Sequence, residues 1–294
     1  MGSAYKKKNL KWILTAIATL LGVLLILYLI PLEEIERAVE RIPPRALLIA
    51  LFLYAFSYLF RSIRWKYYYP KAPFGGLFFT TAVNTFLNNL LPARLGELSI
   101  FALLRRYDPD LKTTLGKFLK VRLLDGFALL SLFTFAVVSV KVNLTAGLLM
   151  GALVYPAGVL ASKYILHLGK RIPLPKGWYE KIPTPRWEPV PFLLSVGALL
   201  SKLLAVYIVL EHLGLDLLRF TVGFLGGEIS TIMPVHSVAG LGSYETSFSL
   251  ALKLFLGEGF KEGFAVGFLS HAFLLLASAL LGLLSLPIFI RLLR

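Results

Sequence analysis

The sequence predicts an all-α polytopic membrane protein with about six transmembrane helices and two re-entrant hairpins, arranged as an inverted repeat. Hydrophobic residues make up 57% of the 294 residues and charged residues only 16%, against about 25% charged residues in an ordinary soluble domain. Six apolar runs are long enough to cross a bilayer, and two more are interrupted by proline or glycine. This composition excludes a soluble enzyme, a disordered chain and, because cysteine is absent, a secreted disulfide scaffold.

Six apolar runs reach the length of a transmembrane helix, which is roughly 20 residues. The first run follows Lys6, Lys7 and Lys8. It is too long for the core of a signal peptide and has no small-residue cleavage site before Pro31, so we interpret it as a retained span. The predicted spans cover residues 10–30, 44–64, 118–140, 144–166, 190–212 and 263–290.

Two other apolar stretches are interrupted. Residues 74–104 are broken at Pro92, and residues 220–257 are broken at Pro234 and at two glycines, Gly240 and Gly242. One interpretation is that these residues only kink ordinary spans, which membrane helices tolerate. The other is that each stretch enters the membrane and returns to the side from which it came.

The distribution of positive charge favours re-entrance. If both interrupted stretches return, twenty-two of the 31 Lys and Arg residues are cytoplasmic and seven lie outside, with Arg94 and Lys202 at membrane depth. If only residues 74–104 crossed fully, the basic segment 105–122 would lie outside, against the positive-inside rule. We therefore expect a multi-pass protein of the plasma membrane with both termini in the cytoplasm.

The order of the predicted elements repeats along a single membrane domain, residues 1–294. Residues 1–142 contain span, span, hairpin and span, and residues 143–294 contain the same series with the opposite orientation. Such inverted repeats, with broken segments at matching positions, are typical of secondary transporters that bind substrate between the broken elements. The Pro-rich and basic segment 168–191 is predicted to be a cytoplasmic connector.

The first hairpin carries polar residues that are costly in a membrane, namely Asn88, Asn89, Arg94 and Glu97. Pro92 suits the first turn of a new helix, whose N-terminus would carry partial positive charge. With Arg94, this end would bind an anionic headgroup, and Gly96 belongs to the same site. The alternative is a buried Arg94–Glu97 ion pair that only holds the hairpin in shape. Both interpretations hold if Glu97 neutralises Arg94 until an anionic ligand takes the place of Glu97.

The second hairpin is predicted to contribute to the same anion site. Gly240 and Gly242 allow an unusual backbone path, Ser243 is a predicted N-cap of the following helix, and Glu245 lies in its first turn. The candidates for proton or ion coupling are Glu97, Glu228, His236 and Glu245.

A third polar cluster begins the span 118–140. Arg122 and Asp125 are three residues apart and so share one helical face, where a local ion pair is the simpler interpretation and a part in substrate binding the other. Lys202 should pair inward or extend to the interface. His236 and His271 are expected to be hydrogen-bonded polar residues, because the sequence contains no ligand-spaced metal motif. We expect no metal, no cofactor and, without a phosphate-binding loop, no use of ATP.

Three motifs resemble those of one family, the lysylphosphatidylglycerol synthase transmembrane region, also called the flippase-like domain family. The resemblance covers nearly the whole chain. It departs at Val121, where the family often has Glu, and at residues 236–240, where it often has Pro-Gly-Gly. The motifs are Asn88-Asn89-Leu-Leu-Pro92-Ala-Arg94-Leu-Gly96-Glu97, Arg122-Leu-Leu-Asp125-Gly126 and Gly240-Leu-Gly242-Ser-Tyr-Glu245.

The resemblance implies an integral membrane protein that moves a lipid, or a lipid-linked headgroup, between leaflets. It implies a functional centre that contains Arg94, Glu97, Arg122, Asp125 and Glu245. The soluble aminoacyl-transferase domain that follows this region in the synthase is absent here, so synthesis of lysylphosphatidylglycerol is not implied.

We therefore expect a lipid flippase-like transporter, not an enzyme. Its cargo would be an anionic phospholipid or a polyprenyl-phosphate-linked lipid. The net charge of +15 is explained by contact of Lys and Arg with anionic headgroups, so no nucleic-acid partner is expected. The alternative is a non-transporting scaffold for a glycosyltransferase or a lipid-modifying enzyme. An intramembrane enzyme ranks last, because no nucleophile or metal motif is evident.

Overall fold

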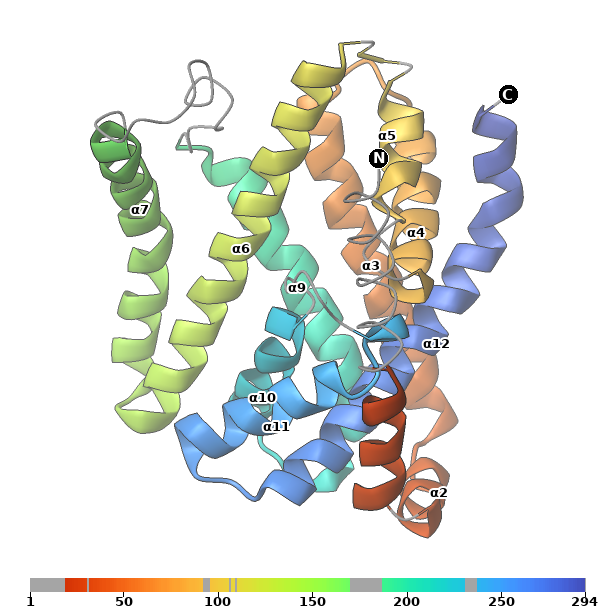
Figure 1. The fold of residues 1–294 in the computed structure, drawn as a ribbon, viewed down its shortest axis with the longest axis vertical. Helices are drawn as coiled ribbons and strands as arrows, with labels where there is room; N and C mark the ends of the chain where they lie inside the picture. The colour runs from red at the N-terminus through yellow and green to blue at the C-terminus, as the bar shows by residue number, and fades with distance from the viewer. Residues whose placement is uncertain are drawn as a thin grey trace, which may run out of the picture.

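A computed structural model of the chain describes residues 19–30, 32–91, 96–105, 107–108, 110–169, 187–230 and 237–293. All regular structure in these ranges is helical, which confirms the predicted fold class (Figure 1). A helix over Thr19–Leu29 comes first. The labelled elements are α2 (Leu32–Glu40), α3 (Pro44–Tyr68), α4 (Phe74–Leu90), α5 (Glu97–Leu104), α6 (Leu111–Lys141), α7 (Leu144–Gly169), α9 (Pro189–Leu210), η2 (Glu211–Leu213), α10 (Leu217–Ser230), η3 (Val238–Gly240), α11 (Ser243–Leu256) and α12 (Phe260–Leu293).

Five of the described helices are long and apolar enough to cross a membrane, namely α3, α6, α7, α9 and α12. Each coincides with a predicted span. The predicted span 10–30 lies partly outside the described residues, which include its helix Thr19–Leu29. Large apolar side chains are exposed on the outer faces of the long helices, among them Leu160 and Leu276. Such a surface is what contact with lipid requires, and the chain is a multi-pass membrane protein.

Helix α6 begins seven residues before the predicted span, because its first turns are polar but capped. The Asp110 carboxylate accepts hydrogen bonds from the backbone N–H groups of Lys112 and Thr113, both at 3.2 Å. A hydrogen bond from the Thr113 hydroxyl, followed by these two backbone bonds, holds the pKa of Asp110 below its usual value. An N-cap of this kind satisfies backbone donors that have no partner within the helix.

The two interrupted stretches each form a pair of short helices, α4 with α5 and α10 with α11. In the first pair, Leu77 near the start of α4 lies in one buried cluster with Leu103 and Leu104 at the end of α5, so the two helices are antiparallel. In the second pair, Arg219 Nη1 lies 2.6 Å from Glu258 Oε1, which joins the start of α10 to the end of α11. Both pairs are therefore helical hairpins.

The helix starts within the hairpins differ from the predicted ones. Helix α5 begins at Glu97, not near Pro92, and residues 92–95 lie outside the described ranges. Helix α11 begins at Ser243, and its N-cap is Gly242. The Ser243 hydroxyl donates to the Gly240 carbonyl at 2.8 Å. The prediction of Ser243 as N-cap is therefore wrong, because its hydroxyl bonds backward to the loop.

The described helices follow one another in two series, while the division of the chain into two repeats stays a prediction. Thr19–Leu29, α3, the α4–α5 hairpin and α6 are followed by α7, α9, the α10–α11 hairpin and α12. Residues 142 and 143, where the predicted halves join, form the short link between α6 and α7. The opposite orientation of the two halves in the membrane stays a prediction.

The connector predicted over residues 168–191 lies largely outside the described part of the chain, which omits residues 170–186. Its C-terminal end is anchored. Lys120 Nζ donates to Glu188 Oε1 at 2.7 Å, and the Tyr68 hydroxyl donates to the other Glu188 oxygen. Glu188 thus ties the start of α9 to α6 and α3.

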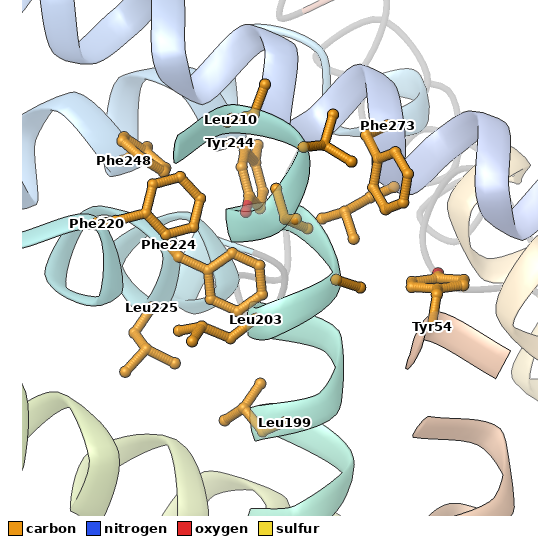
Figure 2. Close-up of a cluster of buried hydrophobic side chains, with 14 of the residues drawn as sticks. Tyr54, Leu199, Leu203, Leu210, Phe220, Phe224, Leu225, Tyr244, Phe248 and Phe273 are labelled. Atoms are coloured by element: carbon orange, nitrogen blue, oxygen red, sulfur yellow. The ribbon is translucent and has the colours of Figure 1, made fainter. Parts of the chain in front are cut away.

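A cluster of large buried side chains holds the second hairpin against the long helices (Figure 2). Phe220 and Phe224 of α10 lie beside Phe248 of α11, and the rings of Phe220 and Phe248 meet edge to face with centroids 5.8 Å apart. Such aromatic pairs contribute about 0.5–1.5 kcal/mol beyond the area they bury. The cluster extends to Leu203 of α9 and Phe273 of α12, so it fixes the hairpin within the bundle.

Small residues on α10 bring α11 into close contact. A Cβ atom added at Gly226 would lie 2.3 Å from Ala251 Cβ and 2.8 Å from the Ser247 carbonyl oxygen. No side chain larger than hydrogen therefore fits at Gly226 without moving α11.

We predict that Gly226→Ala lowers the thermal midpoint of the purified protein, because over-packing costs about 1–3 kcal/mol of unfolding free energy. Gly116→Ala is the matched control, since a Cβ there meets no atom within 4 Å, and alanine is a better helix former than glycine. Thermal unfolding in detergent measures both. An unchanged midpoint for Gly226→Ala would contradict the close packing of α10 on α11.

Candidate functional site

A cavity of about 510 Å³ lies between the two hairpins and the long helices around them. Helices α3, α4, α5, α6, α9, α10, α11 and α12 all contribute to its wall. The apolar part of the wall comes mainly from α6 and α9. The polar and charged lining residues are Arg61, Arg64, Asn84, Thr85, Asn88, Asn89, Glu97, Arg122, Asp125, Ser195, Lys202, Glu228, Ser230, Ser243, Tyr244 and His271.

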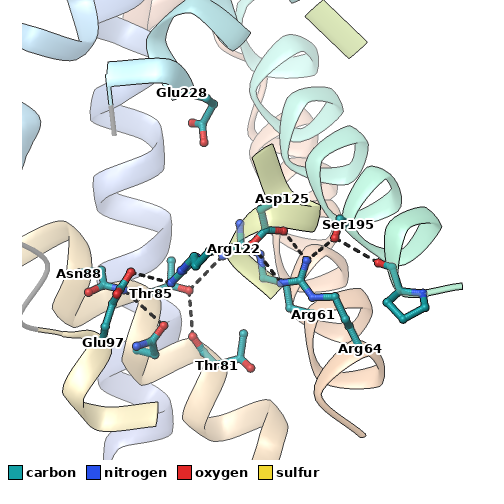
Figure 3. A network of polar contacts seen from close by, with 12 residues as sticks. Arg61, Arg64, Thr81, Thr85, Asn88, Glu97, Arg122, Asp125, Ser195 and Glu228 are labelled. Carbon is teal, nitrogen blue, oxygen red and sulfur yellow. Dashed lines mark hydrogen bonds and ion pairs between the residues drawn. The ribbon is translucent and has the colours of Figure 1, made fainter. Parts of the chain in front are cut away.

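Arg64 on α3 is the most buried cation among the described residues of the cavity wall, with 3% of its side chain exposed, and its partner Asp125 is 34% exposed. One of its terminal nitrogens donates both to Asp125 on α6 and to the Ser195 hydroxyl on α9, and the other lies 3.2 Å from Asp125 Oδ2. Arg64 therefore joins three helices (Figure 3). A guanidinium and a carboxylate that meet through two nitrogen–oxygen contacts have a fixed relative orientation.

Arg122 connects the first hairpin to α6. Its Nη2 atom lies 2.8 Å from Glu97 Oε1, at the start of α5. Its Nη1 atom lies 3.5 Å from Asp125 Oδ2, three residues along α6. The local pair that the sequence predicted is thus present, but the contact across helices is shorter. Together, Glu97, Arg122, Asp125 and Arg64 form one chain of alternating charge (Figure 3).

Helix α4 presents a polar face to the cavity. It is made by two pairs of residues one turn apart, Asn84 with Asn88 and Thr85 with Asn89. The Asn84 amide donates to the Gly96 carbonyl at 2.8 Å, and the Asn89 amide donates to the Ser278 hydroxyl on α12 at 2.8 Å. Arg61 on α3 donates to the Thr85 hydroxyl at 3.3 Å. In the described part of the chain, Arg61 has no carboxylate within ion-pair distance.

Lys202 on α9 and Glu228 on α10 form a third pair in the wall. Lys202 Nζ lies 2.7 Å and 2.8 Å from the two oxygens of Glu228. This contact confirms the expectation that Lys202 pairs inward. The Glu228 side chain lies toward the cavity from α10, apart from the arginine network (Figure 3).

The second hairpin contributes a buried acid–histidine pair. Glu245 is fully buried, and its Oε1 lies 2.8 Å from His271 Nδ1 on α12. The His271 ring stacks on the Tyr244 ring with centroids 4.6 Å apart. Gly240 has φ +75° and lies close to the imidazole edge, so that an added Cβ would be 3.1 Å from His271 Cε1. The unusual backbone path predicted at Gly240 is confirmed.

The structure brings most of the predicted site residues together. Gly96, Gly242 and Glu245 do not line the cavity: Gly96 accepts the Asn84 hydrogen bond in the hairpin turn, Gly242 contacts Gly22 of the first helix, and Glu245 lies behind His271. Arg94 and His236 lie outside the described residues. The predicted residues that line the cavity are Asn88, Asn89, Glu97, Arg122, Asp125, Glu228, Gly240 and Ser243.

Sequence reasoning did not place Arg61, Arg64, Ser195 or His271 in the site. Arg61 and Arg64 lie in the last turn of the predicted span 44–64, and both belong to the twenty-two Lys and Arg residues predicted to be cytoplasmic. Their spacing of three residues puts them on one helical face, which is the signal that indicates a shared orientation. No local signal points to Ser195 or His271, because their contacts come from distant helices.

The described lining residues carry more positive than negative charge. Arg61, Arg64, Arg122 and Lys202 face three carboxylates, those of Glu97, Asp125 and Glu228. Guanidinium groups match the geometry of phosphate and carboxylate oxygens. The cavity can therefore accept an anionic group without a net burial of negative charge.

The chain was compared with known families and proteins. A family model described as the lysylphosphatidylglycerol synthase TM region matches residues 13–282. A search of curated proteins gives no match to the chain. The family match includes every residue of the cavity wall and confirms the resemblance that the three motifs predicted. Because it covers more than half of the sequence, the chain belongs to the lysylphosphatidylglycerol synthase TM region family.

Proposed function

We propose that the protein is a flippase-like transporter that moves a lipid with an anionic headgroup between leaflets, with the headgroup held in the cavity. Membership of the family supports a function that involves membrane lipids. The observation that carries the proposal is the 510 Å³ cavity, with four cationic and three anionic side chains among its described lining residues. An anionic phospholipid and a polyprenyl-phosphate lipid both present this chemistry. The lipid is moved and is not chemically altered.

The lengths of the hairpin helices support re-entrance. Helix α4 has 17 residues, and α10 and α11 have 14 each. At 1.5 Å per residue these helices are about 26 Å and 21 Å long, shorter than the hydrocarbon core of about 30 Å. We therefore propose that the two hairpins enter from opposite sides and meet at the cavity, where α4 contacts η3.

The charge network suggests how a headgroup is bound and released. Arg122 has two carboxylate neighbours, Glu97 at 2.8 Å and Asp125 at 3.5 Å. An anion that approaches Arg122 competes with Glu97, and the carboxylate regains its partner when the anion leaves. Arg61 donates a hydrogen bond to the Thr85 hydroxyl and has no carboxylate within ion-pair distance among the described residues, so an anion that binds Arg61 displaces no ion-pair partner.

Two single substitutions test the site. We predict that Arg61→Gln slows leaflet exchange of fluorescent anionic lipid in proteoliposomes by at least about tenfold. A hydrogen bond to a charged group contributes about 1.5–3 kcal/mol, and 1.4 kcal/mol corresponds to a factor of ten. Lys261→Gln is the matched control, because this exposed lysine at the start of α12 does not line the cavity.

The same assay includes a lipid-linked phosphate and an imposed proton or sodium gradient. Equal rates of leaflet exchange for Arg61→Gln and the wild type would contradict the proposal that the headgroup binds in the cavity. No exchange of any cargo by the wild type, with or without a gradient, would favour the scaffold function over transport.

The membrane topology gives a separate prediction, which the natural absence of cysteine makes testable. Single cysteines at Lys71 and Arg105, at the two ends of the α4–α5 hairpin, should react with an impermeant thiol reagent from the same side, because the hairpin returns. Cysteines at Asp216 and Lys261 should react from the other side. All four positions are exposed. Reaction of Lys71→Cys and Arg105→Cys from opposite sides would show that the first hairpin crosses.

A further inference from the structure

In the Glu245–His271 pair, one oxygen of the buried carboxylate is left without a hydrogen bond among the described residues. Glu245 has no exposed surface, and its second oxygen, Oε2, has no hydrogen-bond partner among the described residues. Its Oε1 contacts one group of the described chain that can carry positive charge, the His271 imidazole. A buried carboxylate with a single hydrogen bond is costly when ionised.

His271 connects this buried acid to the cavity. Its Nδ1 atom faces Glu245, and the opposite edge of its ring, with Cε1 and Nε2, lies beside Gly240 at the cavity wall. The side chain is 9% exposed. A proton can therefore reach Nε2 from water in the cavity, while Nδ1 keeps its hydrogen bond to Glu245.

The other charged and titratable groups near this pair have different partners. On α11, Tyr244 stacks on the His271 ring, and Tyr54 of α3 lies in the same buried cluster. From α10, Glu228 lines the same cavity as Tyr244 and pairs with Lys202 of α9. The cavity carboxylates Glu97 and Asp125 are compensated by arginines, which keep their charge at every physiological pH. Histidine is the side chain that ordinarily changes charge near neutral pH, and His271 is the histidine among the described lining residues.

We propose that Glu245 and His271 form a proton-binding site whose occupancy is linked to anion binding in the cavity. The pair holds one proton when the cavity is empty, which leaves it with no net charge. When an anionic headgroup binds, one more proton enters from the cavity water. The pair then consists of a neutral Glu245, protonated at Oε2, and an imidazolium at His271.

This arrangement accounts for two features of the pair, the unpartnered Oε2 of Glu245 and the position of His271 Nε2 at the cavity wall. A proton on Oε2 displaces no existing donor, and the unprotonated oxygen still accepts from His271 Nδ1–H. The imidazolium directs its Nε2–H toward the cavity, where its charge opposes that of the anion. The inference rests on the proposed function, because it requires an anion in the cavity.

Titration calorimetry counts the protons directly. The full-length protein in detergent is titrated with short-chain phosphatidylglycerol, whose phosphodiester keeps a constant charge between about pH 5 and 8. Repeating the titration in buffers of different ionisation enthalpy gives the number of protons taken up. We expect about one proton per lipid bound in the wild type, and an affinity that falls by up to about tenfold per unit rise in pH, by linkage.

Two histidine substitutions provide the contrast. His271→Gln should bind the lipid through the remaining cations but take up no proton, and its affinity should not change with pH. His212→Gln is the matched control, because His212 contacts the Ala38 carbonyl outside the cavity, and it should behave as the wild type does. A thermal midpoint measured for each variant shows that it is folded.

The outcomes separate this inference from the proposed function. Binding by the wild type without proton uptake, at an affinity independent of pH, overturns the proton site and leaves the anion site in place. Proton uptake that persists in His271→Gln assigns the proton to another group and also overturns it. Failure of the wild type to bind phosphatidylglycerol or a polyprenyl phosphate overturns the proposed function and this inference with it.

Discussion

Charged side chains within an apolar membrane domain must be compensated, and this constraint determines how the helices around the cavity meet. Arg64–Asp125 joins α3 to α6, Arg122–Glu97 joins α6 to α5, and Lys202–Glu228 joins α9 to α10. Each of these pairs lies between two helices. The Arg64–Ser195 contact also links α3 to α9, so the network connects the two halves of the chain. Because breaking a buried pair leaves an uncompensated charge, these pairs fix how the helices around the cavity lie relative to one another.

The hairpins meet this constraint by different means. In the first, the Asn84 side-chain amide donates to the buried Gly96 carbonyl. In the second, glycine lets α10 and α11 approach closely, and left-handed backbone at Gly240 and Gly242 turns the chain into α11. In both hairpins helix ends line the cavity, Asn89 and Glu97 in the first and Ser243 in the second, and the cavity lies between them. The space that results is what an anionic headgroup would occupy.

Much of this architecture could be predicted from the sequence, because transmembrane spans follow from hydrophobic length and interrupted runs follow from proline and glycine. Glu97, Arg122 and Asp125 could be identified as site residues, since charges are costly in apolar segments. The partner of each charged residue could not be predicted from the sequence. Arg64 pairs with a residue 61 positions away, and the Glu245–His271 contact spans 26 positions. Such contacts depend on how the helices pack. The start of α11 was misplaced for a local reason, because the Ser243 hydroxyl has an alternative backbone partner.

The central claim is that the cavity holds an anionic headgroup, and protection of a cysteine inside it tests this claim most directly. Asn89 lines the cavity at the end of α4, and the chain contains no other cysteine. The rate at which Asn89→Cys reacts with a small polar thiol reagent is measured in vesicles of phosphatidylcholine with and without phosphatidylglycerol or a polyprenyl phosphate. The account predicts slower reaction when an anionic lipid is present and no protection by phosphatidylcholine alone. Equal rates with every lipid would contradict it.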